Sequence, residues 1–325
     1  MPVPDSKILE LQDVCVYFPI KKIGQPVQHV RAMEHVSFYI RRGEIFALVG
    51  ESGSGKTTTA KTVVMINQPT SGTVLFEGED VFRKKARKLT YRKNVQMIFQ
   101  NPFDALNPTH TIGSILERPF LVHKTATKRT VKEKVHQLLE QVGLEPTGEF
   151  VNKFPHELSG GERQRVNIAR AVAVNPKLVL ADEPTSMLDV SIKMTIMNML
   201  KELRDEKGLS FLYITHDLAG ARYIADRIGV MYAGVIVEIG PASDVIKHAY
   251  HPYTQLLRSA APQPEKGFIQ DDFQFTGDIP NLADPPSGCR FHPRCSQAEK
   301  RCSLEMPHLV DVSDGHQVRC VKYYK

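Results

Sequence analysis

Short apolar runs recur along this chain, separated by longer segments with helical spacing. Mostly apolar runs predict strands at residues 44–49, 95–99, 178–181 and 209–214. Partial alternation of apolar and polar positions predicts further strands over residues 8–14 and 36–40, with another at 73–76 after a Pro-Thr-Ser-Gly turn. The runs are short and regularly spaced, as in a sheet crossed repeatedly by the chain.

The intervening segments have helical periodicity. Helices are expected directly after residue 57 and over residues 127–142, 158–174 and 191–207. Their stop signals are Gly143, Asn175-Pro176 and Gly208. Strands alternating with helices predict an α/β fold with a mostly parallel sheet, whose ligand groups lie at the carboxyl ends of the strands.

Composition suggests how the chain is divided. Its 325 residues are 42% hydrophobic and 24% charged, which is ordinary for a globular protein. We expect an α/β domain over residues 1–262 with a helical insertion at about 101–175, a proline-containing linker over 263–288, and a tail over 289–325. No signal peptide or membrane-spanning run is evident, so we expect a cytoplasmic protein that reaches membranes only through partners.

The net charge of +6 is unevenly distributed, and residues 81–135 form a strongly basic segment. Such a segment usually forms a solvated face. It is also compatible with a surface near anionic lipid or nucleic acid.

A phosphate-loop motif follows the first apolar strand. Its residues are Gly50, Glu51, Ser52, Gly53, Ser54, Gly55, Lys56 and Thr57, with Thr58 opening the helix beyond. They fit G-x-x-x-x-G-K-[ST] between a strand and a helix, the context that the motif requires. Backbone N–H groups would point at phosphate oxygens, with Lys56 on the β- and γ-phosphates and Thr57 on Mg²⁺. Taken alone, the motif could be a glycine-rich turn.

An acidic pair follows another buried strand. Four apolar residues run into Asp182 and Glu183, as in a Walker B strand. Asp182 would hold Mg²⁺, directly or through water, and Glu183 would polarise the attacking water as general base. Because a Mg²⁺–phosphate site needs both a cradle and carboxylates, this pair and the phosphate loop support each other.

A second anion-binding nest opens a later helix. It consists of Ser159, Gly160, Gly161 and Glu162 after Leu158. Backbone N–H groups and the helix dipole favour phosphate there. One chain does not need two such nests for one nucleotide, so this nest is expected to complete the ATP site of a second protomer.

Together these motifs resemble the ATP-binding subunit of an ABC transporter over about residues 7–262. The resemblance implies an ABC ATPase cassette: a mostly parallel sheet with an antiparallel β subdomain and a helical subdomain. The small cysteine-containing tail would be an additional domain.

The resemblance also implies roles for residues outside the three motifs. Gln100 would be the Q-loop residue that joins Thr57 and Asp182 around Mg²⁺, and His216 the switch histidine that contacts the γ-phosphate. Asp189 would be the D-loop residue that couples two sites across a dimer interface. An aromatic residue should stack on adenine; Tyr17 fits best and Phe18 competes with it.

The partners implied by the resemblance are also specific. Two cassettes would form a head-to-tail dimer with two ATP molecules between them, either as a homodimer or with a second ABC ATPase subunit. Gln100 and the helices after it would relay closure to two membrane-spanning permease subunits. An extracellular substrate-binding protein would contribute indirectly, and nucleic acid would not be a partner. The protein would lie peripherally on the cytoplasmic face of the cell membrane.

Several segments resemble peptide importers in particular. They are residues 100–108, 163–171, 188–192, 251–254, 286–295 and 315–320. The resemblance implies ATP hydrolysis that powers uptake of dipeptides or oligopeptides, while nickel or oligosaccharide import remains an alternative. A soluble ABC ATPase acting on nucleic acid or ribosomes would usually carry two cassettes or a long coiled coil. A non-catalytic sensor would usually lack residues such as Glu183 and His216.

The tail contains a cysteine cluster, formed by Cys289, Cys295, Cys302 and Cys320. A reducing cytoplasm disfavours disulfides, so the cluster predicts a metal site. Its spacing matches neither a zinc ribbon nor the bacterial ferredoxin run. A [4Fe–4S] cluster, which some members of the resembled subfamily carry there, Zn²⁺, and free thiols or disulfides all remain open.

Overall fold

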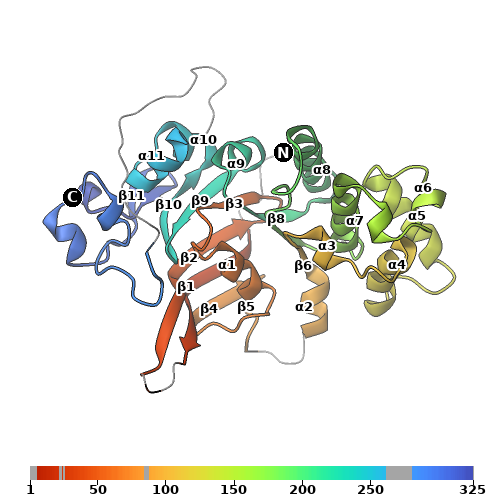
Figure 1. Ribbon diagram of the computed structural model, residues 1–325, viewed down its shortest axis with the longest axis horizontal. Coiled ribbons are helices and arrows are strands. Elements are labelled where there is room, and N and C mark those ends of the chain that lie inside the picture. The colour runs from red at the N-terminus through yellow and green to blue at the C-terminus, as the bar shows by residue number, and fades with distance from the viewer. Residues whose placement is uncertain (1–5, 22–23, 25, 84–87, 261–279, 325) are drawn as a thin grey trace.

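The computed structural model describes residues 6–21, 24, 26–83, 88–260 and 280–324. The helical region lies at one end of the molecule and the C-terminal tail at the other, with the sheets between them (Figure 1). No helix in the described ranges is both long and apolar enough to cross a bilayer.

The larger sheet has eight strands among the described residues, in the order β11-β12-β10-β9-β3-β8-β7-β6. Their bounds are β3 Ile45–Val49, β6 Val95–Ile98, β7 Leu178–Asp182, β8 Ser210–Thr215, β9 Arg227–Tyr232, β10 Val235–Pro241, β11 Val310–Ser313 and β12 His316–Val318. The strands β9, β3, β8, β7 and β6 are parallel neighbours, and β10, β12 and β11 continue the sheet in antiparallel pairs. The carboxyl ends of the parallel strands therefore meet at one edge.

A smaller antiparallel sheet packs beside the larger one, with the order β2-β1-β4-β5. Its strands are β1 Lys7–Ile20, β2 Gln28–Arg41, β4 Ser71–Phe76 and β5 Glu79–Asp80. The ring of Phe38 in β2 stacks on Phe46 in β3 with centroids 4.9 Å apart. The two sheets thus share a buried core, which also includes Ala60 and Val63 of α1 Lys56–Val63.

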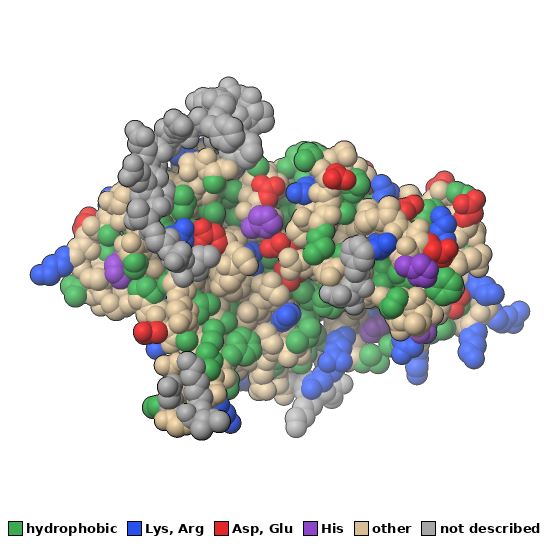
Figure 2. Space-filling view, in the orientation of Figure 1, with side chains coloured by type: hydrophobic (Ala, Val, Ile, Leu, Met, Phe, Trp, Pro, Cys, Tyr) green, Lys and Arg blue, Asp and Glu red, His purple; other side chains and the backbone are tan. Residues whose placement is uncertain are grey.

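The helical region separates β6 from β7 in the sequence. It contains α3 Pro102–Ala105, α4 Ile112–Val122, α5 Val131–Gln141, α6 Thr147–Phe150, the short turn Pro155–Glu157 and α7 Gly160–Val172, and α2 Lys88–Asn94 precedes β6. Leu116, Leu139 and Val166 join the helices in one core. Lys and Arg side chains are prominent on the outer part of this region (Figure 2).

The remaining helices lie between the later strands and in the tail. They are α8 Val190–Lys207, α9 Leu218–Ile224, α10 Ala242–Lys247, α11 Pro252–Ser259 and the 3₁₀ turns His292–Arg294, Lys300–Ser303 and Val321–Tyr323. The tail is part of the main sheet, since Glu238 of β10 pairs with Val318 of β12.

The predicted ABC cassette fold is confirmed, with its parallel sheet, antiparallel sheet and helical region. The helix expected over 127–142 begins later, at Val131, because Thr127 and Thr130 bond each other through backbone and hydroxyl groups. The sequence did not predict helix α4, nor the helices and strands α9, β9, β10, α10 and α11. Most of the expected linker, residues 261–279, lies outside the described residues.

Candidate functional site

The phosphate loop joins the buried strand β3 to α1. Gly55 has φ +109°, a left-handed conformation that favours glycine, and a Cβ there would lie 2.4 Å from the Ala32 carbonyl oxygen. A Cβ on Gly50 would lie 2.1 Å from the carbonyl oxygen of Met231. The motif's first and last glycines are therefore required by close backbone approach.

The Lys56 side chain lies across its own loop and is only 4% exposed. Its Nζ donates to the carbonyl oxygens of Gly50 at 2.7 Å and Glu51 at 2.8 Å. Burial lowers the pKa of the ammonium group, while the carboxylates of Glu183, Asp182 and Glu51 oppose the shift. A cation held in this position can neutralise phosphate charge within the loop.

Thr57 and Asp182 lie together although they belong to different motifs. Thr57 Oγ1 donates to Asp182 Oδ1 at 3.2 Å, and Asp182 ends β7 with 2% exposure. Burial raises the pKa of the Asp182 carboxyl, and the hydrogen bond from Thr57 opposes this rise. A hydroxyl and a carboxylate oxygen side by side suit Mg²⁺, which prefers oxygen ligands.

Glu183 lies at the centre of a second group of polar side chains. Gln100 Nε2 donates to Glu183 Oε2 at 3.2 Å, and His216 Nδ1 lies 3.3 Å from the same oxygen. The Glu183 backbone has φ 45°, an uncommon left-handed conformation for a residue with a side chain. Residues following β6, β7 and β8 therefore meet at one carboxylate, as the parallel sheet predicts.

The second nest forms the N-terminus of α7. Ser159 Oγ accepts from the Glu162 N–H at 3.3 Å, and Glu162 Oε2 accepts from both the N–H and the hydroxyl of Ser159 at 2.7 Å. These bonds from Ser159 lower the pKa of Glu162. Gly160 and Gly161 form the first turn, and Ser159 is exposed. The side chains of Ser159 and Glu162 bond each other rather than the phosphate loop.

The other candidates occupy distinct positions. Tyr17 donates from its hydroxyl to Glu34 Oε1 at 2.9 Å, and burial raises its pKa. Glu34 also pairs with the buried Arg290 of the tail. Phe18 is 40% exposed. Asp189 is exposed at the start of α8, without a side-chain capping bond.

Two residues that contact the phosphate loop were missed by sequence reasoning. Arg294 of the tail pairs with the Glu51 carboxylate, and the Tyr253 hydroxyl accepts from the Glu51 N–H at 2.8 Å. Tyr253 lies within the His-Pro-Tyr-Thr segment at 251–254, whose resemblance to peptide importers was the available signal. Arg294 likewise lies within a segment that resembles peptide importers, 286–295, but no pattern in the sequence pairs it with Glu51.

The four tail cysteines line one small cavity together with His251 and His292. Burial raises the pKa of Cys289 to about 11, and the other three thiols add to the shift. Cys15 is separate from them and buried in the core. Within the described residues, no group of three or more His, Cys, Asp or Glu side chains is arranged to hold a metal ion. The predicted metal centre is therefore not supported by this arrangement.

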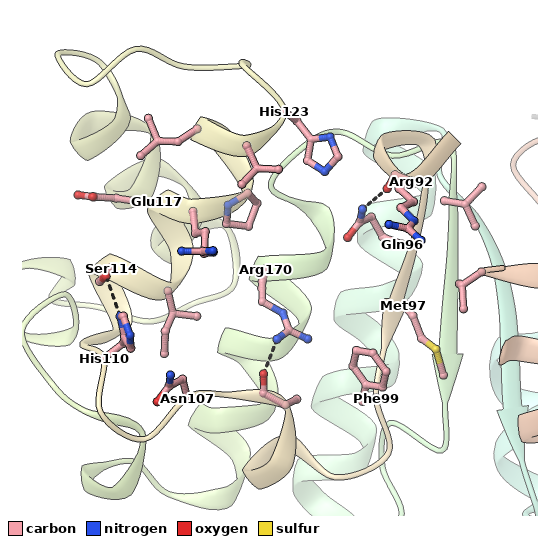
Figure 3. Close-up of a pocket in the computed structure, with 18 of the residues that line it drawn as sticks. Arg92, Gln96, Met97, Phe99, Asn107, His110, Ser114, Glu117, His123 and Arg170 are labelled. Atoms are coloured by element: carbon pink, nitrogen blue, oxygen red, sulfur yellow. Dashed lines mark hydrogen bonds between the residues drawn. The ribbon is translucent and has the colours of Figure 1, made fainter. Parts of the chain in front are cut away.

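A groove of about 1130 Å³ lies between the helical region and β6. Arg92 and Gln96 come from one wall and His110, Ser114 and Glu117 from the other, with Arg170 of α7 between them (Figure 3). The groove is also lined by the apolar side chains of Ile66, Phe99, Ile115, Leu121 and Val122. This basic and apolar surface lies next to Gln100, which follows Phe99.

Comparison with known proteins identifies two matching regions. The family described as ABC transporter matches residues 33–186, and the family described as the C-terminal region of oligopeptide/dipeptide transporters matches residues 237–302. The chain is 44% identical to the oligopeptide transport ATP-binding protein AppF of Bacillus subtilis, covering 97% of each chain. It is 40% identical to the dipeptide transport ATP-binding protein DppF of Haemophilus influenzae, covering 94% of this chain and 93% of the relative.

Solved structures with the same fold include the ATP-binding cassette MJ0796 bound to ADP and Pi. The TM-score is 0.63 at 29% identity, covering 72% of this chain and 98% of that one. The cbiO1 protein of Clostridium perfringens, part of the ABC transporter complex cbiONQ, gives a TM-score of 0.65 at 25% identity, covering 75% and 92%. The similarity thus covers nearly the whole length of these two solved cassettes.

Proposed function

This chain belongs to the ATP-binding proteins of ABC-type oligopeptide and dipeptide transporters, and we propose from this premise that it hydrolyses ATP to power peptide uptake through membrane-spanning partners. The observation that carries the proposal is the meeting of Thr57 with Asp182 and of Gln100 and His216 with Glu183. The relatives' names refer to oligopeptide and dipeptide transport, which supports the substrate class.

The site residues divide the chemistry between them. Loop N–H groups and Lys56 bind the phosphates, and Thr57 and Asp182 would hold Mg²⁺ with Gln100 nearby. Bound Mg²⁺ neutralises charge on the phosphate oxygens. Glu183 accepts the proton of the attacking water, and His216 orients that water and contacts the γ-phosphate.

A second cassette is expected to complete each ATP site. Ser159 is exposed at the N-terminus of α7, and the apolar residues Met187 and Val190, on either side of Asp189, are 57% and 78% exposed. An exposed nest beside exposed apolar side chains suits a protein interface. The solved relative MJ0796 is described as dimeric. The partner here is either a second copy or a second ABC ATPase.

The groove beside Gln100 is the proposed contact for the permease subunits. Asn167 Nδ2 donates to the Phe99 carbonyl at 3.2 Å, and the Arg170 guanidinium donates to Asn167 Oδ1 at 3.0 Å. A membrane subunit pressing into the groove would therefore act on the segment that carries Gln100. The protein would work at the cytoplasmic face of the membrane, with an extracellular binding protein supplying substrate.

We propose that the four tail cysteines hold a [4Fe–4S] cluster, with Zn²⁺ as the alternative. The support for this proposal is that all four cysteines line one cavity, and four thiolates are a ligand set for such a cluster. Anaerobically purified protein should be brown and contain iron. Colourless protein with one zinc per chain would contradict the cluster.

Purification from native membranes tests the transport function. We expect two membrane subunits and a second ATPase to accompany the protein, and the reconstituted complex to take up radiolabelled dipeptide only with ATP. Recovery of ribosomes or DNA instead would contradict it. Uptake of nickel or an oligosaccharide but not peptide would retain the ATPase and change the substrate.

A further inference from the structure

An ion pair connects the tail to the phosphate loop. Arg294 Nη1 lies 2.9 Å from Glu51 Oε2, and Nη2 lies 3.2 Å from Oε1, so the guanidinium donates to both carboxylate oxygens. The side chains are only 12% and 26% exposed. Two parallel contacts and little exposure distinguish this pair from ordinary surface ion pairs, which contribute little to stability.

The backbone of the same loop residue is held independently. The Glu51 N–H donates to the Tyr253 hydroxyl at 2.8 Å, and Tyr253 is fully buried. Its ring lies 4.5 Å from Tyr232 and 5.5 Å from Phe291. Arg294 lies over two of these rings, those of Tyr232 and Phe291. One packed aromatic group therefore supports both contacts to Glu51.

The negative charge of Glu51 bears on how strongly the loop binds ATP. A carboxylate within a phosphate-binding loop repels the anion that the loop receives, and this repulsion is strong where water is scarce. Arg294 neutralises that carboxylate and holds it on the tail side of the loop. The Glu51 carbonyl oxygen meanwhile accepts from Lys56, so a displaced Glu51 would also disturb the lysine.

We propose that Arg294 is a positioning residue for the phosphate loop and that the C-terminal region thereby sets the affinity for ATP. The effect acts through Glu51 and rests on the proposed ATPase function. Arg294 does not itself touch the reacting groups. Losing it should weaken nucleotide binding and leave the chemical step nearly unchanged.

The test compares Arg294→Ala with the double variant Glu51→Gln/Arg294→Ala. We expect the KM for ATP to rise about tenfold in the single variant, with kcat within about twofold. The double variant should return close to the parent KM, because the unpaired carboxylate is gone. Binding of a fluorescent ATP analogue, measured in a Glu183→Gln background, should show the same order of affinities.

Arg301→Ala is the matched control. Arg301 is also in the tail and pairs with Glu299 at 2.9 Å, but both side chains are about half exposed. Its loss should leave the KM unchanged. Arg294→Lys keeps the charge but not the two-point contact and should give an intermediate KM; it decides the matter if thermal unfolding shows that Arg294→Ala does not fold.

The outcomes separate the proposal from its premise. An unchanged KM in folded Arg294→Ala, or in Arg294→Lys if only that variant folds, would overturn the positioning role. An equal rise in the single and double variants would assign the effect to packing and overturn the charge mechanism. If the parent protein lacked ATPase activity altogether, the proposed function itself would fail.

Discussion

His216 Nδ1 and Glu183 Oε2 lie 3.3 Å apart at the ends of neighbouring strands, and Gln100 donates to that same oxygen. The parallel pairing of β6, β7 and β8 brings these three side chains together. One carboxylate oxygen is thereby poised between a histidine and an amide, where it can receive a proton from water.

Replacing this carboxylate should stop turnover. Glu183→Gln keeps the shape of the side chain but cannot accept the proton, so kcat should fall by at least about 100-fold. ATP should still bind and trap a closed dimer, visible by size-exclusion chromatography. Glu299→Gln, an exposed change in the tail, should behave like the parent. Hydrolysis near the parent rate in Glu183→Gln would show that another group is the base.

The contact between Thr57 and Asp182 predicts how the protein responds to Mg²⁺. Asp182→Asn removes the charge that would hold the cation, so hydrolysis should fall about 100-fold or more and require higher Mg²⁺. Thr57→Ser keeps the hydroxyl and should retain most of the rate. A Mg²⁺ titration of phosphate release measures both effects. An unchanged requirement in Asp182→Asn would remove Asp182 from the proposed metal site.

The groove predicts a variant that separates assembly from catalysis. Leu121 lines it and is 38% exposed, so Leu121→Glu should block association with the permease subunits while the isolated protein keeps its ATPase rate. Co-purification with the membrane subunits measures the loss. Leu304→Glu, at a 72% exposed site in the tail, is the control. Normal assembly of Leu121→Glu would place the contact elsewhere.

A buried histidine makes stability depend on pH. Burial lowers the pKa of His251 to about 3, whereas histidine in the unfolded chain titrates near about 6.5. Between these values only the unfolded chain binds the proton, so the free energy of unfolding should fall as pH drops from about 6.5 towards 3. The slope reaches about 1.4 kcal/mol per pH unit.

Denaturant unfolding would measure this dependence at pH values of about 7.5, 6 and 5, which lie on both sides of the pKa of about 6.5 for histidine in the unfolded chain. His251→Asn should be less stable at the highest pH, because the Tyr253 N–H loses its acceptor Nδ1, but its stability should vary less with pH. His248→Asn, at an exposed position nearby, should keep the parent's slope. An unchanged slope in His251→Asn would exclude this histidine as the cause.

Local motifs explain which parts of the site could be predicted. The phosphate loop and the strand ending at Asp182 each carry their pattern in consecutive residues, and the parallel sheet then places Gln100 and His216 beside them. The pairing of Arg294 with Glu51 joins residues 243 positions apart. No periodicity or turn chemistry predicts this contact, because it depends on how Phe291 of the tail packs against Tyr232 and Tyr253.

The cysteines show a different limit of sequence reasoning. Their clustering indicated that they would lie near one another, and all four line one cavity. Spacing alone did not fix the distances between the sulfurs, which depend on the turns at His292–Arg294 and Lys300–Ser303. A sequence shows which side chains could bind a metal, whereas the distances between those side chains are set by the folded loops.

The pairing of β12 with β10 makes the tail a protective element for the cassette. A chain shortened before the tail would leave β10 as an open edge, whose unpaired N–H and C=O groups invite strands from other molecules. It would also leave Glu238, which is fully buried and accepts from His316, without that partner. Aggregation is therefore the expected fate of a minimal cassette cut from this protein.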